Sequence, residues 1–272
     1  MISIGVITPT YNRPDLLKRL HLSIERTTRE ADWIHYVVDD GSGKEYQAVL
    51  DELTQTSDKL RYQKIENSGP LAARNQAIDM ALADDVDFLC FLDDDDVLLS
   101  PGLDAVAAAA ARHRDCDWLI FHSKVEGKDI VFEGDEPKPV DWFQDAILNK
   151  TVRSDSFCIV STKLIGRTRF SEKQRNQREW TFFLDLHEKN PSILLFPMAL
   201  RGVIYLDDGL TAQTDRRAYH VEQLSNNVER AFRYWKNAPT NKILLRNLFL
   251  QILSFPIKAA LGSWVLQKKG RS

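Results

Sequence analysis

The sequence contains few cysteines and no long uninterrupted hydrophobic run. Its three cysteines lie at wide, unrelated spacings, so neither a disulfide framework nor a cysteine metal site is expected. No apolar segment of secretory-signal length follows the first residues, because a turn cluster begins at Pro9. The apolar stretch 243–266 contains Arg246, Pro256 and Lys258, which make it a poor membrane-spanning helix. These absences favour a protein of the reducing cytoplasm.

Negative charge is missing from the end of the chain. The net charge of all 272 residues is −3, but nine lysines and arginines follow Glu229, the last acidic residue. Removing these nine from the total of 36 leaves 27 basic against 39 acidic residues in 1–229, a net charge of −12. A basic tail with bulky apolar residues predicts peripheral binding to an anionic membrane surface, here the inner face of the cytoplasmic membrane. Packing on its own domain or on a second subunit is the alternative. Nucleic acid is not expected, since the acidic body lacks interleaved aromatic and basic residues.

Short apolar strands alternate with helical patterns in the first hundred residues. Strands are expected at residues 2–8, 34–38, 60–65 and 88–92, with helices from Pro14 and around 73–81. This order predicts an α/β fold with an open, mostly parallel, Rossmann-like sheet flanked by helices. Ligands of such sheets bind beyond the carboxyl ends of the strands, where polar clusters follow three of these segments.

From residue 101 the pattern changes. The sequence predicts helices at 103–112 and 179–187, a charged loop at 171–178, and strands at 118–121, 130–132, 157–160, 193–196 and 203–206. These elements would extend the same sheet. An amphipathic helix at 221–235 would then lead into a helical basic tail.

The strongest chemical signal is an acidic run directly after the apolar segment 88–92. It consists of Asp93, Asp94, Asp95 and Asp96. Adjacent carboxylates repel one another, so folding them together is unfavourable without a cation. Their hard oxygen atoms suit Mg²⁺ or Mn²⁺, which also bridge to phosphate oxygens. A solvated acidic turn is the alternative, but the position after a buried strand favours a site.

Four segments together resemble the family 2 glycosyltransferases of GT-A fold. They are 8–13 (TPTYNR), 38–42 (VDDGS), 69–75 (GPLAARN) and 92–96 (LDDDD). Each segment alone is a weak indication of this family, but the four segments in this order across the first hundred residues are a specific one. The resemblance implies that residues 1–100 form a nucleotide-sugar-binding half and that 101–225 form an acceptor-binding half of the same domain, followed by the tail 226–272.

The resemblance also implies a donor site and a metal site. Asp93 and Asp95 are similar to the family's DxD motif, and Asp95 and Asp96 would hold ribose and metal, with His220 approaching the metal or the diphosphate. A structural role is the alternative for His220. The side chains expected to contact the donor are Thr8, Pro9, Tyr11, Arg13, Asp39, Asp40, Arg74, Asp93 and Asp95.

The second half departs from the family's pattern at the catalytic base. The family carries a pair of acids at the start of a helix, of which the second is the base. Here Glu179 takes that position and Arg178 replaces the first acid. A carboxylate can take the proton of an acceptor hydroxyl. The alternative is a helix N-terminal acid favoured by the helix dipole.

The resemblance to this family, together with the acidic run, implies an inverting, metal-dependent glycosyltransferase. It would move one sugar from a nucleotide-sugar, by default a UDP-sugar, to a saccharide or lipid-linked acceptor in cell-surface polysaccharide or lipopolysaccharide synthesis. A non-catalytic nucleotide-sugar-binding scaffold and another metal-dependent nucleotide-processing enzyme are the alternatives.

Overall fold

The computed structural model describes residues 1–125, 134–149, 151–153, 156–172, 179–203, 229, 232–234 and 236. The chain divides into two compact units, Met1–Leu206 and Asp207–Ser272. The described residues of the second unit are helical, and the rest of the predicted helix 221–235 and the basic tail lie outside the described residues. None of the described helices combines the length and the hydrophobicity that a membrane crossing requires.

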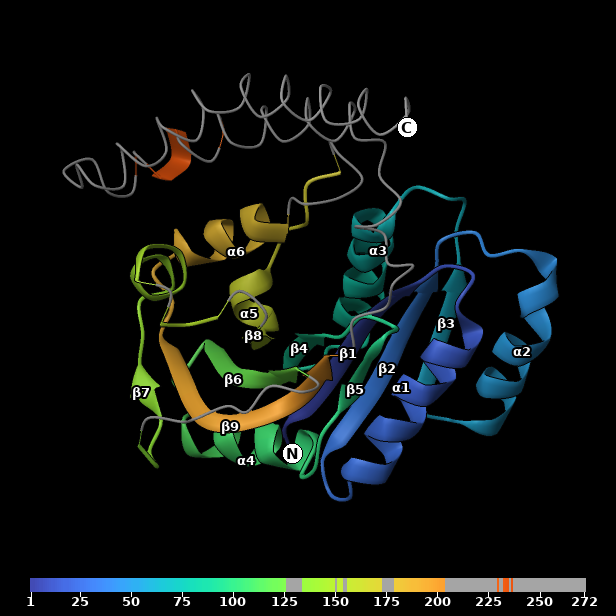
Figure 1. Cartoon of the computed structure of the whole chain (residues 1–272), viewed down its shortest axis with the longest axis horizontal. Coiled ribbons are helices and arrows are strands. Elements are labelled where there is room, and N and C mark those ends of the chain that lie inside the picture. Colours follow the sequence, from blue (N-terminus) through green and yellow to red (C-terminus); the bar gives the residue numbers. More distant parts are fainter. Residues whose placement is uncertain are drawn as a thin grey trace, which may run out of the picture. The chain divides into compact units, whose positions relative to one another are not determined.

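Nine described strands of the first unit form one sheet (Figure 1). Its order is β3–β2–β1–β4–β8–β6–β9–β5, and β7 pairs with β9. The predicted parallel part is present: β1 (Ser3–Thr10), β2 (Asp32–Asp39), β3 (Leu60–Lys64) and β4 (Phe88–Phe91) pair only in parallel with one another. Antiparallel pairing of β8 (Phe157–Ser161) with β4 and with β6 (Trp118–Val125) then extends the same sheet. The second half of the sheet is therefore mixed.

Strand β9 (Ile193–Val203) begins with the strand predicted at 193–196 and continues as far as Val203, through residues 197–202 where no strand was predicted. It is parallel to β6 and antiparallel to β5 (Asp96–Leu98) and β7 (Lys138–Pro139). Pro197 interrupts its apolar pattern, and the register with β6 shifts opposite this proline. Proline lacks the backbone N–H and is tolerated in a strand at such an irregularity. Residues 130–132 and 204–206 lie outside the described residues.

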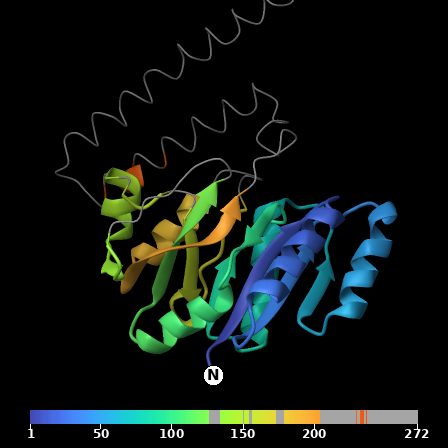
Figure 2. The same ribbon diagram turned by 60° about the horizontal axis from the view of Figure 1, so that its bottom comes forward.

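Helices cover both faces of the sheet. Figure 2 shows α1 (Pro14–Thr27) and α4 (Leu103–Arg112) against one face. Phe91 of β4 points to the other face, since side chains alternate along a strand, and there it contacts Phe182 of α6 (Glu179–His187). The remaining helical elements are η1 (Lys44–Tyr46), α2 (Gln47–Thr56), α3 (Pro70–Ala83), the π-helical turn η2 (Phe143–Leu148) and α5 (Thr162–Ile165).

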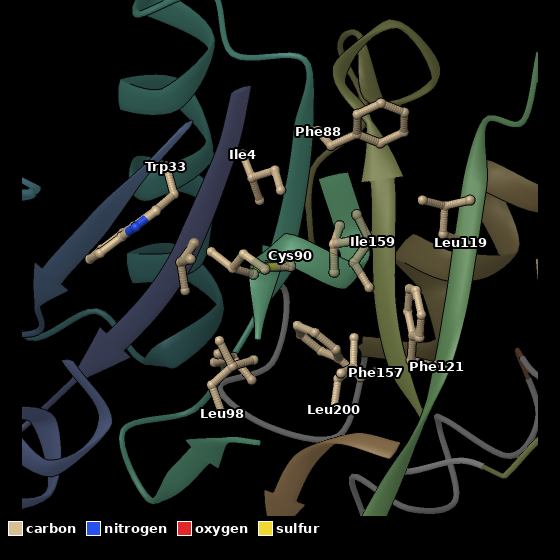
Figure 3. Close-up of a cluster of buried hydrophobic side chains, with 14 of the residues drawn as sticks. Ile4, Trp33, Phe88, Cys90, Leu98, Leu119, Phe121, Phe157, Ile159 and Leu200 are labelled. Carbon is tan, nitrogen blue, oxygen red and sulfur yellow. The ribbon is translucent and has the colours of Figure 1, made fainter. Parts of the chain in front are cut away.

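The main core lies between the sheet and the helices α1 and α4. Side chains of β1, β4, β6, β8 and β9 converge there (Figure 3), and Leu20 and Ile24 of α1 join them. Cys90 is fully buried in this core, and burial raises the pKa of its thiol. The same core therefore spans both halves of the sheet and fixes the strand ends that carry the polar segments.

Candidate active site

Three polar segments expected at the ends of β1, β2 and β4 lie together. The backbone N–H of Asp40 donates to the carbonyl of Thr10 (2.9 Å), and the N–H of Asn12 donates to Ser42 Oγ (2.8 Å). Thr10 Oγ1 in turn donates to Asp94 Oδ2 (2.9 Å). Parallel neighbouring strands end at one edge, which brings together residues far apart in the sequence.

The acidic run forms a tight turn between β4 and β5. Asp96 donates its N–H to the carbonyl of Asp93 (3.0 Å), and its Oδ2 accepts the N–H of Asp93 (2.9 Å). Asp96 is also the first residue of β5 and pairs with Val203 of β9. The side chain of Asp96 is 5% exposed, whereas that of Asp93 is 48% exposed. The run therefore contains both a buried and an accessible carboxylate.

Arginines from three different elements pair with these carboxylates. Arg13, which precedes α1, lies 3.4 Å from Asp94 and 3.4 Å from Asp95. Arg74 of α3 pairs with Asp93. Arg201 Nη1 of β9 lies 3.5 Å from Asp96 Oδ2. A fourth arginine, Arg19 of α1, donates to the carbonyl of Asp95 (2.7 Å).

Sequence analysis missed Arg201, because no motif surrounds it. The tertiary pairing of β9 with β5 is what brings it beside Asp96. Arg19 was not predicted either, because in the sequence it is only one of several charged residues on an amphipathic helix.

The electrostatics of the acidic run are unbalanced. Burial raises the pKa of Asp94 to about 6, although Thr10 and Arg13 oppose the change. Burial raises the pKa of Asp96 to about 7, with Asp93 and Asp95 adding to it and Arg201 opposing it. The pKa of Asp95 is raised by burial and by Asp93. Burial is therefore the main cause of all three raised pKa values, and the neighbouring arginines do not offset it.

The charge and the chemistry of the run fit a divalent cation. Among the described residues, the four carboxylates of the run and Glu179 lie beside four arginines, one of which is Arg19 at the carbonyl of Asp95, so negative charge exceeds positive charge by one. No group of three or more His, Cys, Asp or Glu side chains in the described part of the chain is arranged as a metal site. Mg²⁺ is commonly held by one or two carboxylates together with substrate phosphates. Asp95 and Asp96 fit that pattern, and His220 lies outside the described residues.

The Asp39–Asp40 pair is buried and makes hydrogen bonds within the protein. Asp39 accepts from Ser42 N (2.8 Å) and from Tyr62 Oη (2.9 Å). Asp40 accepts from the N–H groups of Ser68 (2.6 Å) and Gly69 (2.9 Å), directly before α3. Asp40 therefore places a negative charge at the positive end of α3. Contact of either aspartate with the donor stays a prediction.

The segment after β1 has a buried and an exposed part. Thr8 and Pro9 are buried in β1, and Thr8 Oγ1 lies 2.9 Å from His35 Nε2. Burial and the neighbouring His21 hold the pKa of His35 well below its usual range, so its imidazole is neutral. Tyr11 is 45% exposed. Its ring is thus open to a flat ligand such as a nucleotide base.

Glu179, the candidate base, lies in the first turn of α6 and meets the acidic run through Arg74. Arg74 Nη1 lies 3.3 Å from Glu179 Oε1, while its Nη2 binds Asp93. Glu179 is 40% exposed, and an ion pair this open to water contributes roughly 0–1 kcal/mol to stability. The contact with Arg74 therefore affects the position of the Glu179 side chain more than the stability of the fold. Arg178 lies outside the described residues.

Comparison with known proteins agrees with this geometry. The profile of Glycosyl transferase family 2 matches residues 5–170. The chain is 27% identical over 226 residues to a GalNAc(5)-diNAcBac-PP-undecaprenol beta-1,3-glucosyltransferase of Campylobacter jejuni, with 81% of this chain and 71% of that protein covered.

Solved structures support the fold. The crystal structure of S. aureus TarS 1-349 has a TM-score of 0.63 and 20% identity, covering 95% of this chain and 81% of the other. The same protein in complex with UDP-GlcNAc has a TM-score of 0.67 and 19% identity, covering 93% and 72%. The likeness confirms the predicted α/β fold of GT-A type. Because the family profile covers more than half of its residues, the chain belongs to glycosyl transferase family 2 and is a glycosyltransferase.

Proposed function

We propose that this enzyme transfers one sugar from a nucleotide-sugar to a saccharide or lipid-linked acceptor, with inversion at the anomeric carbon and with a divalent cation. The observation that carries the proposal is the approach of Glu179 to the acidic run, since Arg74 binds Glu179 and Asp93 at once. One arginine thus connects the proposed base with the run that is proposed to bind the diphosphate.

The donor is proposed to be a UDP-sugar bound at the ends of β1, β2 and β4. Support comes from the fold it shares with TarS, a structure of which contains UDP-GlcNAc. Tyr11 would stack on the base from its exposed position, and Arg13 and Arg74 would contact the donor's ribose or diphosphate. Thr8, Pro9, Asp39 and Asp40 would shape the pocket, and Asp93 and Asp95 would hold the ribose.

The cation is proposed to be Mg²⁺ or Mn²⁺, held by Asp95 and Asp96 with oxygen atoms of the donor diphosphate. His220 remains a further proposed ligand. When bound, the cation would supply positive charge for the leaving nucleoside diphosphate. The raised pKa values of both aspartates support this assignment, because a cation would favour their charged forms.

The chemistry proposed for the protein's own residues is a single displacement. Glu179 takes the proton from the acceptor hydroxyl as that oxygen attacks the anomeric carbon. A new bond from carbon to the acceptor oxygen forms on one face while the bond to the donor phosphate breaks on the other. The nucleoside diphosphate leaves, so the configuration inverts without a covalent intermediate. Arg13 and Arg74 remain beside the developing negative charge.

The acceptor is proposed to be lipid-linked, in the synthesis of a cell-surface polysaccharide or lipopolysaccharide. The relative from Campylobacter jejuni is named for an undecaprenol-linked substrate. We assign donor binding to residues 1–100, acceptor binding to 101–225 and membrane contact to the basic tail 226–272. This tail would hold the enzyme at the inner face of the cytoplasmic membrane, beside such an acceptor.

A donor panel tests the proposed function. The purified full chain is incubated with several nucleotide-sugars, with Mn²⁺, Mg²⁺ or EDTA, and released nucleotide is measured. We expect release from one donor, dependent on the cation and lost in Asp96→Ala. Binding of UDP without release from any donor, even with a polyprenyl-diphosphate-linked saccharide present, would contradict the catalytic proposal. Release that persists in EDTA would contradict the metal assignment alone.

A further inference from the structure

One side chain of α3 connects the acidic run with the start of α6. We propose that Arg74 is a positioning residue for sugar transfer: it holds Glu179 at the acidic run, where the sugar–phosphate bond is broken. The inference rests on the proposed function, since it takes Glu179 as the base. It gives Arg74 a role on the acceptor side, in addition to any contact with the donor.

The first support is the geometry of the bridge. Nη1 of Arg74 contacts Glu179 Oε1 at 3.3 Å, and Nη2 contacts Asp93 Oδ1. The side chain of Arg74 is 11% exposed, so its surroundings limit its movement. Burial opposes its charge, but Asp93 and Glu179 outweigh that effect and raise the pKa of Arg74. A planar guanidinium presents its donors in a rigid fork, and two carboxylates on one fork are held in a fixed relation.

The second support is the neighbouring residue, Asn75, which holds the chain before α6. Asn75 Nδ2 donates to the carbonyl of Phe170 (2.9 Å) and to Glu172 Oε1 (2.7 Å), and Asn75 Oδ1 accepts the N–H of Phe170 (2.8 Å). Phe170 stacks on Phe182 of α6, with ring centroids 4.1 Å apart. Two consecutive residues of α3 therefore act on α6, Arg74 directly through Glu179 and Asn75 indirectly through Phe170.

The third support is that α3 is itself a fixed element. The two residues directly before it, Ser68 and Gly69, donate their N–H groups to the carboxylate of Asp40. The guanidinium of Arg74 also lies 5.8 Å from the ring centroid of Phe170, within reach of a cation–π contact. Arg74 thus extends from a fixed helix to a glutamate whose side chain is 40% exposed.

The consequence for catalysis is a matter of distance. A general base must lie within hydrogen-bond reach of the proton that it removes. A misplacement of about 1 Å can lower the rate about 100-fold. An exposed Glu179 without its partner would reach the acceptor hydroxyl only part of the time. Loss of Arg74 should then lower kcat for transfer by a larger factor than it weakens binding of the donor.

The kinetic experiment uses the full chain and compares wild type, Arg74→Lys and Arg74→Gln. The control is Arg169→Gln, which removes an exposed ion pair between Arg169 and Asp79 of the same helix. Transfer is measured with the donor that is active in the panel, and binding is measured with UDP by calorimetry. We expect Arg74→Gln to lower kcat about 10- to 100-fold and to raise the Kd of UDP by a smaller factor, since Arg74 is also proposed to contact the donor. Arg74→Lys should restore only part of kcat, and the control should match wild type.

A double-mutant cycle separates positioning from a general structural effect. If Arg74 acts through Glu179, then Arg74→Gln should lower kcat by a much smaller factor in a Glu179→Gln background than in the wild type. Independent, multiplying losses would overturn the inference, and so would a loss confined to the Kd of UDP. Both results leave the proposed function intact, because wild type still transfers and Glu179→Gln is still strongly impaired.

Hydrogen exchange tests the same inference without turnover. Amides of residues 179–187 should exchange faster in Arg74→Gln than in wild type or Arg169→Gln. Unchanged exchange in Arg74→Gln would overturn the inference even if transfer is observed. Absence of transfer by wild type would instead overturn the proposed function.

Discussion

Glu179 lies in the first turn of α6, where a glutamate can stabilise a helix without any catalytic role. Its contact with Arg74, and through it with Asp93, distinguishes it from an ordinary helix-terminal acid. We expect Glu179→Gln to lower the rate of transfer about 10²- to 10⁴-fold, the range of general-base catalysis, with UDP binding retained. Steady-state kinetics and calorimetry measure the two effects.

The control for this prediction is Asp185→Asn, a carboxylate of the same helix that the proposed chemistry does not use. It should transfer sugar at nearly the wild-type rate. Equal losses in the two variants would contradict a specific role of Glu179 and favour a structural effect on α6.

Asp96 provides a prediction of pH dependence. Its pKa is about 7 in the folded protein, above the value of about 3.9 for an unfolded chain. Between these values the folded state binds more protons, so this group makes the protein less stable as the pH rises from 4 to 7. Asp96→Asn cannot ionise. In EDTA its unfolding free energy should therefore improve relative to wild type as the pH rises, by up to about 1.4 kcal/mol per pH unit.

Denaturant unfolding at pH 4.5, 6 and 7.5 measures this difference. Asp104→Asn is the control, because the pKa of Asp104 is lowered in the folded protein whereas that of Asp96 is raised. Burial opposes ionisation of Asp104, but three backbone N–H groups lower its pKa, so its stabilising effect is present above pH 4 and lost at lower pH. Its variant should be less stable than wild type by a nearly constant amount from pH 4.5 to 7.5. A constant difference for Asp96→Asn as well would argue against a buried, poorly compensated carboxylate.

At the scale of the element, Asp40 links the motif after β2 to the start of α3. Its carboxylate accepts two backbone N–H groups at the N-terminal end of a helix. Asp40→Asn should lower the free energy of unfolding by roughly 1–2 kcal/mol, through loss of the charge–dipole interaction and of one charged hydrogen bond. Asp15→Asn, an exposed acid in the first turn of α1, should change it by at most about 0.5 kcal/mol. Chemical denaturation distinguishes these outcomes, and equal effects would contradict the role assigned to Asp40.

The elements with strong periodicity were predictable. The apolar run before the acidic residues is β4, and Pro14 begins α1, since proline at the first helical position loses no backbone hydrogen bond. Strand β5 was not predicted, because three residues are too few to show an alternating pattern. Helix α2 was missed because only Leu50 and Leu53 mark its buried face.

The parts of the candidate site that are formed by residues close in the sequence could be predicted. Contacts that depend on the pairing of distant strands could not. The acidic run and the segment after β1 follow from strand–turn patterns, and the structure brings them together through Thr10 and Arg13. Arg201 depends on the pairing of β9 with β5, which no local pattern indicates. The hydrogen bonds of Asp39 and Asp40 likewise depend on β3 and α3, which follow later in the chain.

At the scale of the whole molecule, the acidic run and α6 are positioned by the same sheet. The run follows β4, and α6 packs on Phe91 of that strand. The antiparallel pairing of β8 with β4 joins the parallel part to the mixed part, and residues of both parts share one core. A core that spans both halves resists relative movement of the two sides. This arrangement explains how side chains from separate parts of the chain, such as Arg74 and Glu179, can be held in one geometry.

The asymmetry of charge gives the last prediction. The body 1–229 carries a net charge of −12, which anionic lipid repels, whereas nine positive charges follow it. Five of them lie within residues 240–269, and each Lys or Arg near an anionic leaflet contributes about 1 kcal/mol. The full chain should float with anionic vesicles at low salt and less at high salt. A full-length variant with these five residues changed to glutamine should stay with the soluble fraction. Equal flotation of both proteins would contradict an electrostatic tail, and flotation that salt does not weaken would point to apolar contact alone.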